Sequence, residues 1–288
     1  MRLSFKQQAG LLALLLVACI YAFQYAQGIA PTTIMSVSFL DIGQGDAIYI
    51  RAPNGADMLV DGGPDAAVLS ELAHIMPAFD RSIDIVIATH PDKDHIAGLV
   101  PVFEKYAVKK YLHSEVASDS SYDESLAEAA ANEPSLEQIE ARRGERIVLD
   151  ETHGIYVDIL FPDQDTSRFK ETNDASIVAR LVYGNQSFLL TGDSPQSVEE
   201  WLVKTDGVRL QSSVLKLAHH GSNSASSPEY LKTVHPDYAI VSAGKNNTYH
   251  HPSAAVVTRV KDLRIPLLST IDSGTITFAT DGMEIWIK

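Results

Sequence analysis

The sequence has very little cysteine, because among its 288 residues only Cys19 carries a thiol. No disulfide can therefore form within the chain. It also has fewer basic than acidic residues: 23 Lys and Arg against 37 Asp and Glu, which gives a formal net charge of −14. Proteins that bind nucleic acid mainly through its phosphates usually carry a basic face. A polyanionic substrate would therefore have to be held by bound metal and a few local cations.

One long apolar run lies near the N-terminus, from Ala9 to Phe23, behind the cations Arg2 and Lys6. A basic segment followed by an apolar one is the layout of an export signal. The run is short for a membrane span, which needs about 20 apolar residues. A buried core helix is the alternative interpretation. We expect residues 1–32 to be a signal peptide, a lipoprotein signal or a membrane anchor.

Cys19 stands in the sequence Leu16-Val17-Ala18-Cys19, which resembles a bacterial lipobox, the signal for lipidation of the cysteine. The residues that follow stay apolar, so a small residue within a plain signal anchor is the competing interpretation. Under either interpretation we expect residues 33–288 to form one catalytic domain outside the cytoplasm, exported or held at the membrane.

Short strands and amphipathic helices fill the rest of the chain. The expected strands include Met35–Leu40 and Asp57–Val60, and Ile83–Ala88 is expected to be a buried strand. The acidic stretch Asp119–Arg142 predicts one or two surface helices. There is no internal repeat and no low-complexity linker. Two blocks of strands with surface helices predict an α+β fold, a four-layer αββα sandwich.

The chemistry concentrates in the run Thr89-His90-Pro91-Asp92-Lys93-Asp94-His95, which follows the buried strand. Four potential ligands lie within six residues there. Close carboxylates repel one another unless a cation lies between them. His90 with Asp92 is expected to hold one ion, and Asp94 with His95 a second. Imidazole and carboxylate together suit zinc, manganese or iron.

Three further clusters follow strands. Asp193 ends the apolar sequence Phe188-Leu189-Leu190-Thr191-Gly192-Asp193, where a turn or helix-cap role is the alternative. The other two clusters are Leu215-Lys216-Leu217-Ala218-His219-His220-Gly221-Ser222 and Asn246-Asn247-Thr248-Tyr249-His250-His251-Pro252. Ligand-type residues that gather so often at strand ends favour one shared metal site.

The ordered set FLDIGQGDA, LVDGG, THPDKDHIAG, LLTGD, LKLAHHGS and NNTYHHP resembles the hydrolase domain of ComEC-type competence proteins, in the metallo-β-lactamase-fold superfamily. The resemblance runs from about Ser36 to Lys288. It implies the αββα sandwich, with two divalent ions, Mn²⁺ or Zn²⁺, at one edge. The multi-span channel of full competence proteins is absent from this sequence.

By matching motifs, the resemblance implies six metal ligands: His90, Asp92, Asp94, His95, Asp193 and His219. Asp61 is expected to orient a ligand through a hydrogen bond, and Asp41 and Asp46 are expected to support the site in the same way. Asp94, His220 and His251 are the expected catalytic groups. For substrate contact we expect Lys216, Ser222, Asn247 and His251. Whether His219 or His220 binds metal stays open.

Two departures from the superfamily pattern bear on the metal. Asp92 occupies the place of the second histidine in the commoner HxHxDH motif, which favours manganese. No histidine corresponds to the superfamily's middle ligand, because Asn173-Asp174-Ala175-Ser176 occupies that part of the order. The first ion is therefore expected to be held weakly.

Two cations can acidify a water molecule and stabilise charge that develops during displacement. Our first hypothesis is phosphodiester cleavage, with DNA or a small phosphodiester as substrate. Hydrolysis of a lactam, lactone or thioester is the second. The third is a membrane-tethered binding protein with an incomplete metal site. The sequence leaves the oligomeric state open.

Overall fold

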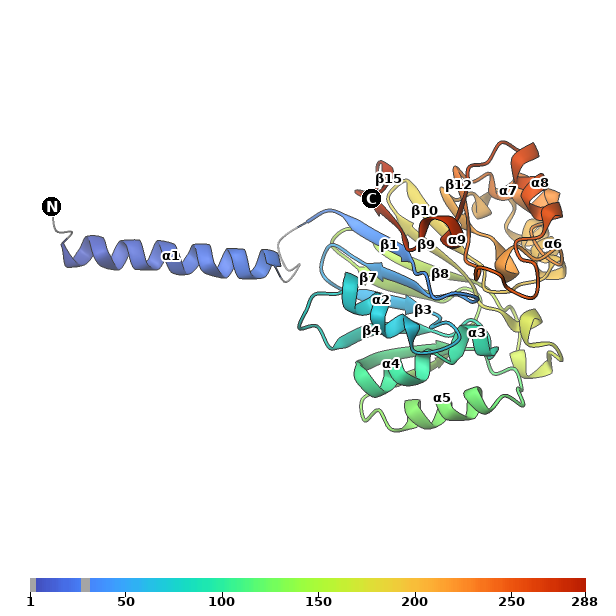
Figure 1. Ribbon diagram of the computed structural model, residues 1–288, viewed down its shortest axis with the longest axis horizontal. Coiled ribbons are helices and arrows are strands. Elements are labelled where there is room, and N and C mark those ends of the chain that lie inside the picture. Colours follow the sequence, from blue (N-terminus) through green and yellow to red (C-terminus); the bar gives the residue numbers. More distant parts are fainter. Residues whose placement is uncertain (1–3, 27–31) are drawn as a thin grey trace.

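The computed structural model describes residues 4–26 and 32–288, with the side chains of residues 21–26 left aside. Helix α1 (Phe5–Ala26) covers the predicted apolar run and lies apart from the rest of the molecule (Figure 1). Its side chains are exposed from Phe5 to Ile20, and Cys19 is exposed among them. Among the residues that the structure describes, no helix is both long and apolar enough to cross a membrane.

The strands of the described residues form two sheets that pack face to face. The first has the order β15-β14-β1-β2-β3-β4-β5-β6. Its bounds are β1 (Met35–Phe39), β2 (Ile48–Arg51), β3 (Asp57–Val60), β4 (Ser82–Ile87), β5 (Ala107–His113), β6 (Glu137–Glu140), β14 (Ile276–Thr280) and β15 (Ile285–Ile287). The β-branched and aromatic residues that alternate along these strands suit a pleated surface with two covered faces.

The second sheet has the order β13-β12-β11-β10-β9-β8-β7. Its bounds are β7 (Arg146–Asp150), β8 (Ile155–Phe161), β9 (Val178–Tyr183), β10 (Gln186–Leu190), β11 (Val214–Lys216), β12 (Tyr238–Val241) and β13 (Leu267–Ser269). Strands β10, β11, β12 and β13 run parallel to one another. Their carboxyl ends therefore meet at one edge, where ligands bind in open α/β sheets.

Three apolar layers hold the sandwich together. The central one lies between the sheets and includes Val37, Ile50, Leu181 and Phe278. Each outer layer joins one sheet to its helices. The helices over the first sheet are α2 (Ala67–Ile75), α4 (Leu99–Lys105) and α5 (Ser121–Ala131), with the short α3 (Lys93–Ile96) beside them. Those over the second are α6 (Gln196–Asp206), α7 (Pro228–Val234) and α8 (Ala254–Asp262).

Figure 1 shows the helices on the outer faces of both sheets, so the predicted four-layer α+β sandwich is confirmed. The remaining short elements are α9 (Thr270–Ser273) and the 3₁₀ turns η1 (Thr166–Arg168), η2 (Thr172–Ala175), η3 (Gly207–Leu210) and η4 (Ala218–Gly221). The acidic stretch holds one helix, α5, and then the strand β6, which pairs with β5. Its polar residues fit there because β6 ends the sheet, where charged side chains are common.

Candidate metal centre

The predicted ligands lie just beyond the carboxyl ends of three strands. β4 ends at Ile87 and leads into His90, while β10 ends at Leu190 and leads into Asp193. β11 ends at Lys216 and leads into the paired histidines of η4. The facing edges of the two sheets thus bring together side chains that are far apart in the sequence.

Asp193 lies at the centre of this cluster. Its Oδ1 is 3.2 Å from His95 Nε2, and its Oδ2 is 4.0 Å from His90 Nε2. The same Oδ2 is 3.7 Å from both His219 Nε2 and His220 Nε2. One buried carboxylate therefore faces four imidazole rings, which is the arrangement expected of a group shared by two cations.

The other two predicted ligands approach opposite sides of the cluster. Asp92 Oδ2 lies 3.7 Å from His90 Nε2, whereas Asp94 Oδ2 lies 3.3 Å from His220 Nε2. Both carboxylates are partly exposed. Asp92 thus lies beside His90, its predicted partner, whereas Asp94, predicted to pair with His95, has its contact with His220. All six predicted ligands lie in one cluster, and the ion positions stay a prediction.

Several polar atoms of this cluster are buried and have no hydrogen-bond partner among the described residues. They are Asp46 Oδ1, His90 Nε2, His95 Nε2, Asp193 Oδ1 and His220 Nε2. A buried polar atom without a partner costs about 1–3 kcal/mol, so five in one place require an explanation. Asp46, His95, Asp193 and His220 each offer a ligand atom within 4.8 Å of the others. This donor set of imidazole nitrogens and carboxylate oxygens fits divalent cations.

The far sides of the ligand rings are held by hydrogen bonds. Asp61 Oδ2 lies 2.8 Å from His95 Nδ1 and accepts a hydrogen bond from the Thr89 hydroxyl at 2.8 Å. The same hydroxyl lies 3.0 Å from His90 Nδ1. An Asp61 partner on Nδ1 leaves Nε2 of His95 free to face a metal. The predicted orienting role of Asp61 thus agrees with its contacts, while that of Thr89 was not foreseen.

His219 and His220 differ sharply in exposure. The His220 side chain is 1% exposed, and its Nδ1 lies 3.0 Å from the carbonyl oxygen of Ser242. The His219 side chain is 29% exposed, and its Nδ1 lies 3.0 Å from the Ser224 hydroxyl. Both residues have left-handed φ values, 51° and 52°, which strain a residue other than glycine. The burial favours His220 as a ligand, whereas we had expected a catalytic role for it and the ligand role for His219.

The charges in the cluster shift one another's ionisation. Burial alone would raise the pKa of Asp193, but His220 and His95 outweigh it and hold the pKa well below its ordinary value. Burial would likewise lower the pKa of His220, but Asp193 and Asp46 raise it to about 9. Burial lowers the pKa of the more exposed His219. Metal ligation needs neutral imidazole, so cations compete with protons at His220 and His95.

Two predicted residues lie where their expected roles do not fit. Lys216 was expected to contact substrate, but it is 0% exposed. Its ammonium donates to Asp46 Oδ2 at 2.7 Å and to the Leu217 carbonyl at 3.0 Å. The corrected role is internal, because this cation neutralises Asp46 behind His220. Asp41, expected to support the site, is instead exposed, and only its backbone amide makes a hydrogen bond, to Thr275, within the described residues.

The other substrate-contact candidates lie in loops beside His219. The Asn247 amide is taken up by backbone groups, since it donates to the His251 carbonyl at 2.7 Å and accepts from the His251 N–H at 2.9 Å. It therefore positions His251, whose ring centroid lies 5.6 Å from that of His219. Ser222 accepts a hydrogen bond from Ser224, the residue that touches His219. Their side chains order the loops beside the metal cluster.

The segment that lacks the middle histidine still contacts the cluster. The Thr172 hydroxyl donates to Asp92 Oδ1 at 2.6 Å, and the Asp193 N–H donates to the Ser176 hydroxyl at 3.2 Å. Asn173 Oδ1 is buried and has no hydrogen-bond partner among the described residues. The sequence order located this segment, but no motif marked Thr172 as a partner of Asp92.

A tight glycine turn between β1 and β2 contacts the cluster. Gly45 has φ of 134°, and a Cβ there would overlap the backbone carbonyl oxygen of Asp94. The next residue, Asp46, donates its N–H to that same carbonyl at 3.2 Å. The motif FLDIGQGDA therefore fixes the Asp94 backbone and brings the Asp46 carboxylate beside His220.

With this geometry established, comparison with known proteins identifies the family. The model of the metallo-beta-lactamase superfamily matches residues 40–245. The chain belongs to this superfamily. It is 28% identical over 260 residues to ComE operon protein 3 of Bacillus subtilis, covering 84% of this chain and 32% of that protein. It is 32% identical over 258 residues to competence protein ComA of Neisseria gonorrhoeae, covering 88% of this chain and 33% of ComA.

These relatives support the predicted likeness to ComEC-type proteins, although this superfamily member spans about a third of their length. Among solved structures, the metallo-beta-lactamase fold protein YhfI from Bacillus subtilis matches with a TM-score of 0.55 and 14% identity. That match covers 82% of this chain and 95% of YhfI, and it bears on the fold alone. The family together with the candidate metal cluster supports a metal-dependent hydrolase.

Proposed function

We propose that this chain is a binuclear metal-dependent phosphodiesterase that acts on DNA or on a small phosphodiester. The observation that carries the proposal is the convergence of otherwise unpartnered imidazole nitrogens and carboxylate oxygens around Asp193. Two divalent cations in such a site would lower the pKa of water and stabilise the charge of a displaced phosphate oxygen. The likeness to competence proteins supports a DNA-related substrate.

The chain's own residues divide into holding and reacting groups. We assign one ion position to His90, Asp92 and His219, and the other to Asp94, His95 and His220, with Asp193 between them. Three carboxylates beside four imidazoles form a donor set that suits Mn²⁺ or Zn²⁺. The exposure of His219 leaves its half of the cluster nearer to solvent.

Asp94 and His251 are the groups proposed to act on substrate. The Asp94 side chain is 31% exposed, so one face of its carboxylate is open to accept a proton from water. His251 has a buried Nδ1 without a hydrogen-bond partner among the described residues, and Asn247 holds its backbone. We assign it contact with the substrate phosphate or with the departing oxygen.

A metal-loaded activity screen tests this function. The full chain loaded with Mn²⁺ or Zn²⁺ is incubated with single- and double-stranded DNA, with a chromogenic small phosphodiester, and with lactam, lactone and thioester substrates. We expect phosphodiester cleavage that is lost in Asp94→Ala. Cleavage only of lactams, lactones or thioesters by a metal-loaded chain would replace the proposal with the second hypothesis.

The binding-protein hypothesis draws on one observation, the Asn173 segment in place of the middle histidine. Metal analysis separates it from the enzyme. We expect bound metal in the wild type and its loss in Asp94→Ala with His95→Ala. Absence of metal from both proteins would favour the binding protein.

We also propose that residues 1–32 export the domain or hold it at a membrane, with residues 33–288 as the catalytic domain outside the cytoplasm. The exposed apolar side chains of α1 support this, because such surfaces mark interaction sites. Lipidation of Cys19 is one form of the proposal. Fractionation of cells that express the wild type or Cys19→Ser tests it: recovery of all the wild type in the soluble cytoplasmic fraction would contradict it.

A further inference from the structure

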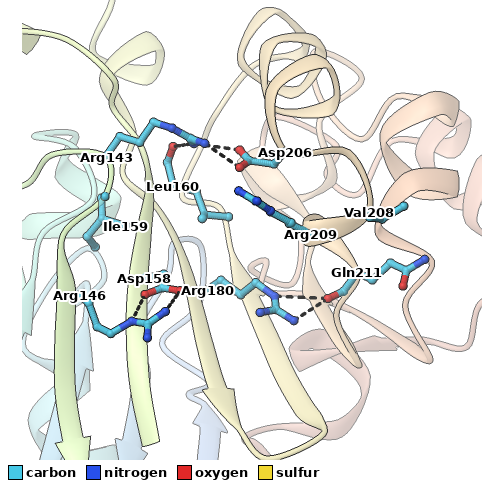
Figure 2. A pocket seen from close by; sticks show the side chains of 11 residues that line it. Arg143, Arg146, Asp158, Ile159, Leu160, Arg180, Asp206, Val208, Arg209 and Gln211 are labelled. Carbon is cyan, nitrogen blue, oxygen red and sulfur yellow. Dashed lines mark hydrogen bonds and ion pairs between the residues drawn. The ribbon is translucent and has the colours of Figure 1, made fainter.

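A second site lies on the outer face of the second sheet, away from the metal cluster. A cavity of about 560 Å³ is lined by four arginines, Arg143, Arg146, Arg180 and Arg209, together with Asp158 and Asp206. We call it the arginine pocket. None of its lining residues belongs to the metal cluster. Figure 2 shows side chains from β8, β9 and the end of α6 gathered around one space.

The pocket is positive although the chain is acidic. Four arginines against two aspartates leave two excess positive charges, in a chain whose net charge is −14. Arg143 pairs with Asp206 at 2.6 Å, and Arg146 pairs with Asp158 at 2.6 Å. These two pairs account for both carboxylates, so the excess charge belongs to Arg180 and Arg209.

Arg180 is half-buried among neutral oxygens. It donates to the Gln211 carbonyl at 2.9 Å and to the Ser187 hydroxyl at 3.0 Å, and no carboxylate lies within 4.0 Å of it among the described ion pairs. Burial lowers its pKa and outweighs the opposing effect of Asp158, which faces it across β8 and β9 but is paired with Arg146. The exposed Arg209 makes no hydrogen bond or ion pair within the described part of the chain, and Figure 2 shows its guanidinium directed into the same space.

The paired arginines also lie over aromatic rings. The Arg143 guanidinium lies 5.1 Å from the Trp201 ring centroid, and that of Arg146 lies 3.8 Å from the Tyr156 centroid. Planar guanidinium groups bind phosphate in two-pronged geometry, and preorganised ones lose less entropy on binding. Two arginines paired with aspartates and two without a carboxylate in ion-pair distance among the described residues surround one cavity, which therefore suits oxyanions that carry more than one charge.

We propose that the arginine pocket binds phosphate groups, supplied by a nucleic-acid strand or by a small free phosphate. The inference goes beyond the proposed hydrolase and does not depend on cleavage. Arg180 on β9 pairs in register with Leu189 on β10, and Asp193 follows Leu189 by four residues, just beyond the end of β10. A nucleic-acid strand bound in the pocket would thus contact the same sheet that carries Asp193 of the metal cluster. It would also give an acidic chain the local cations that a polyanion requires.

Binding is measured with the full chain in a non-ionic detergent and EDTA, so that metal-dependent cleavage does not contribute. The probes are a fluorescent single-stranded oligonucleotide, read by anisotropy across a salt series, and pyrophosphate, read by calorimetry. The test variant is Arg180→Gln with Arg209→Gln, which leaves both arginine–aspartate pairs intact. The matched control is Lys232→Gln with Lys261→Gln, which removes two exposed charges from α7 and α8.

For an oligonucleotide ligand, the test variant is expected to bind at least about 10-fold more weakly, with a log–log salt slope shallower by about 1.4. The control should stay within about twofold of the wild type. Arg180→Lys with Arg209→Lys keeps both charges but not the guanidinium geometry, so it should keep the salt slope of the wild type. If only pyrophosphate binds and its binding is lost in the test variant, the occupant is a small phosphate.

Equal binding of both probes by the wild type and the test variant, or equal loss in the control, would overturn the proposal. A wild type that binds neither probe would also overturn it. Circular dichroism and the unfolding midpoint check that the variant folds. If it does not, Arg209→Gln alone, at an exposed residue without described partners, carries the same test.

Discussion

Replacement of Lys216 by methionine isolates the charge that lies beneath the metal cluster. Lys216 is 0% exposed and Asp46 is 1% exposed, and their charged atoms are 2.7 Å apart. The substitution removes the ammonium partner of Asp46 and leaves His220, which Asp193 shares, as its cationic neighbour. Removal of one member of a buried ion pair typically costs about 3–5 kcal/mol. That is a large part of the roughly 5–15 kcal/mol by which ordinary domains are stable.

The free energy of unfolding is measured in urea at pH 7 with EDTA, so that bound metal does not mask the protein's own charges. We expect Lys216→Met to lower it by about 3–5 kcal/mol. Lys216→Met with Asp46→Asn should recover most of the loss, because no buried charge then lacks a partner. A loss below about 1 kcal/mol, or a double variant no more stable than the single one, would refute the reasoning.

Two further predictions concern residues around the site, and a third concerns Asp57, which lies beyond it. Gly45→Ala should displace the Asp94 backbone and lower the metal content measured by mass spectrometry, whereas Gly10→Ala, in open space on α1, should not. Asp61→Asn should weaken Mn²⁺ binding in calorimetry by about 10–100-fold, because His95 loses the carboxylate that orients it; unchanged affinity would remove Asp61 from the site. Burial raises the pKa of Asp57 to about 6 from 3.8, so ionisation opposes folding: its contribution is favourable below pH 4 and is lost as the pH rises to about 6. At about 1.4 kcal/mol for each pKa unit the loss is about 3 kcal/mol, and Asp57→Asn should abolish that part of the pH dependence measured in urea.

The sequence could group the candidate metal-site residues because these residues follow strands directly. Apolar runs that end at His90, Asp193 and Lys216 mark the carboxyl ends of β4, β10 and β11, which the packing of the two sheets then brings together. The four-layer fold could be predicted for the same reason, since alternating strands and amphipathic helices leave apolar faces that must pack.

Other features depend on tertiary contacts that no local pattern records. Lys216 in a strand of apolar neighbours gives no sign that its partner is Asp46, 170 residues away. The Thr172 hydroxyl meets Asp92 across 80 residues. The difference in burial between His219 and His220 is also hidden, because two adjacent histidines look alike in sequence. The arginine pocket has no local sequence pattern, because its four arginines are scattered through an acidic chain.

The most direct test of the account is the number of Mn²⁺ ions bound per chain after equilibrium dialysis, in wild type and in Asp193→Asn. Asp193 faces His90, His95, His219 and His220, so a single change at this residue affects both ion positions. The account predicts two ions per wild-type chain and a clear loss in Asp193→Asn. A wild type that binds no metal, or a variant that still binds two ions with unchanged affinity, would contradict it.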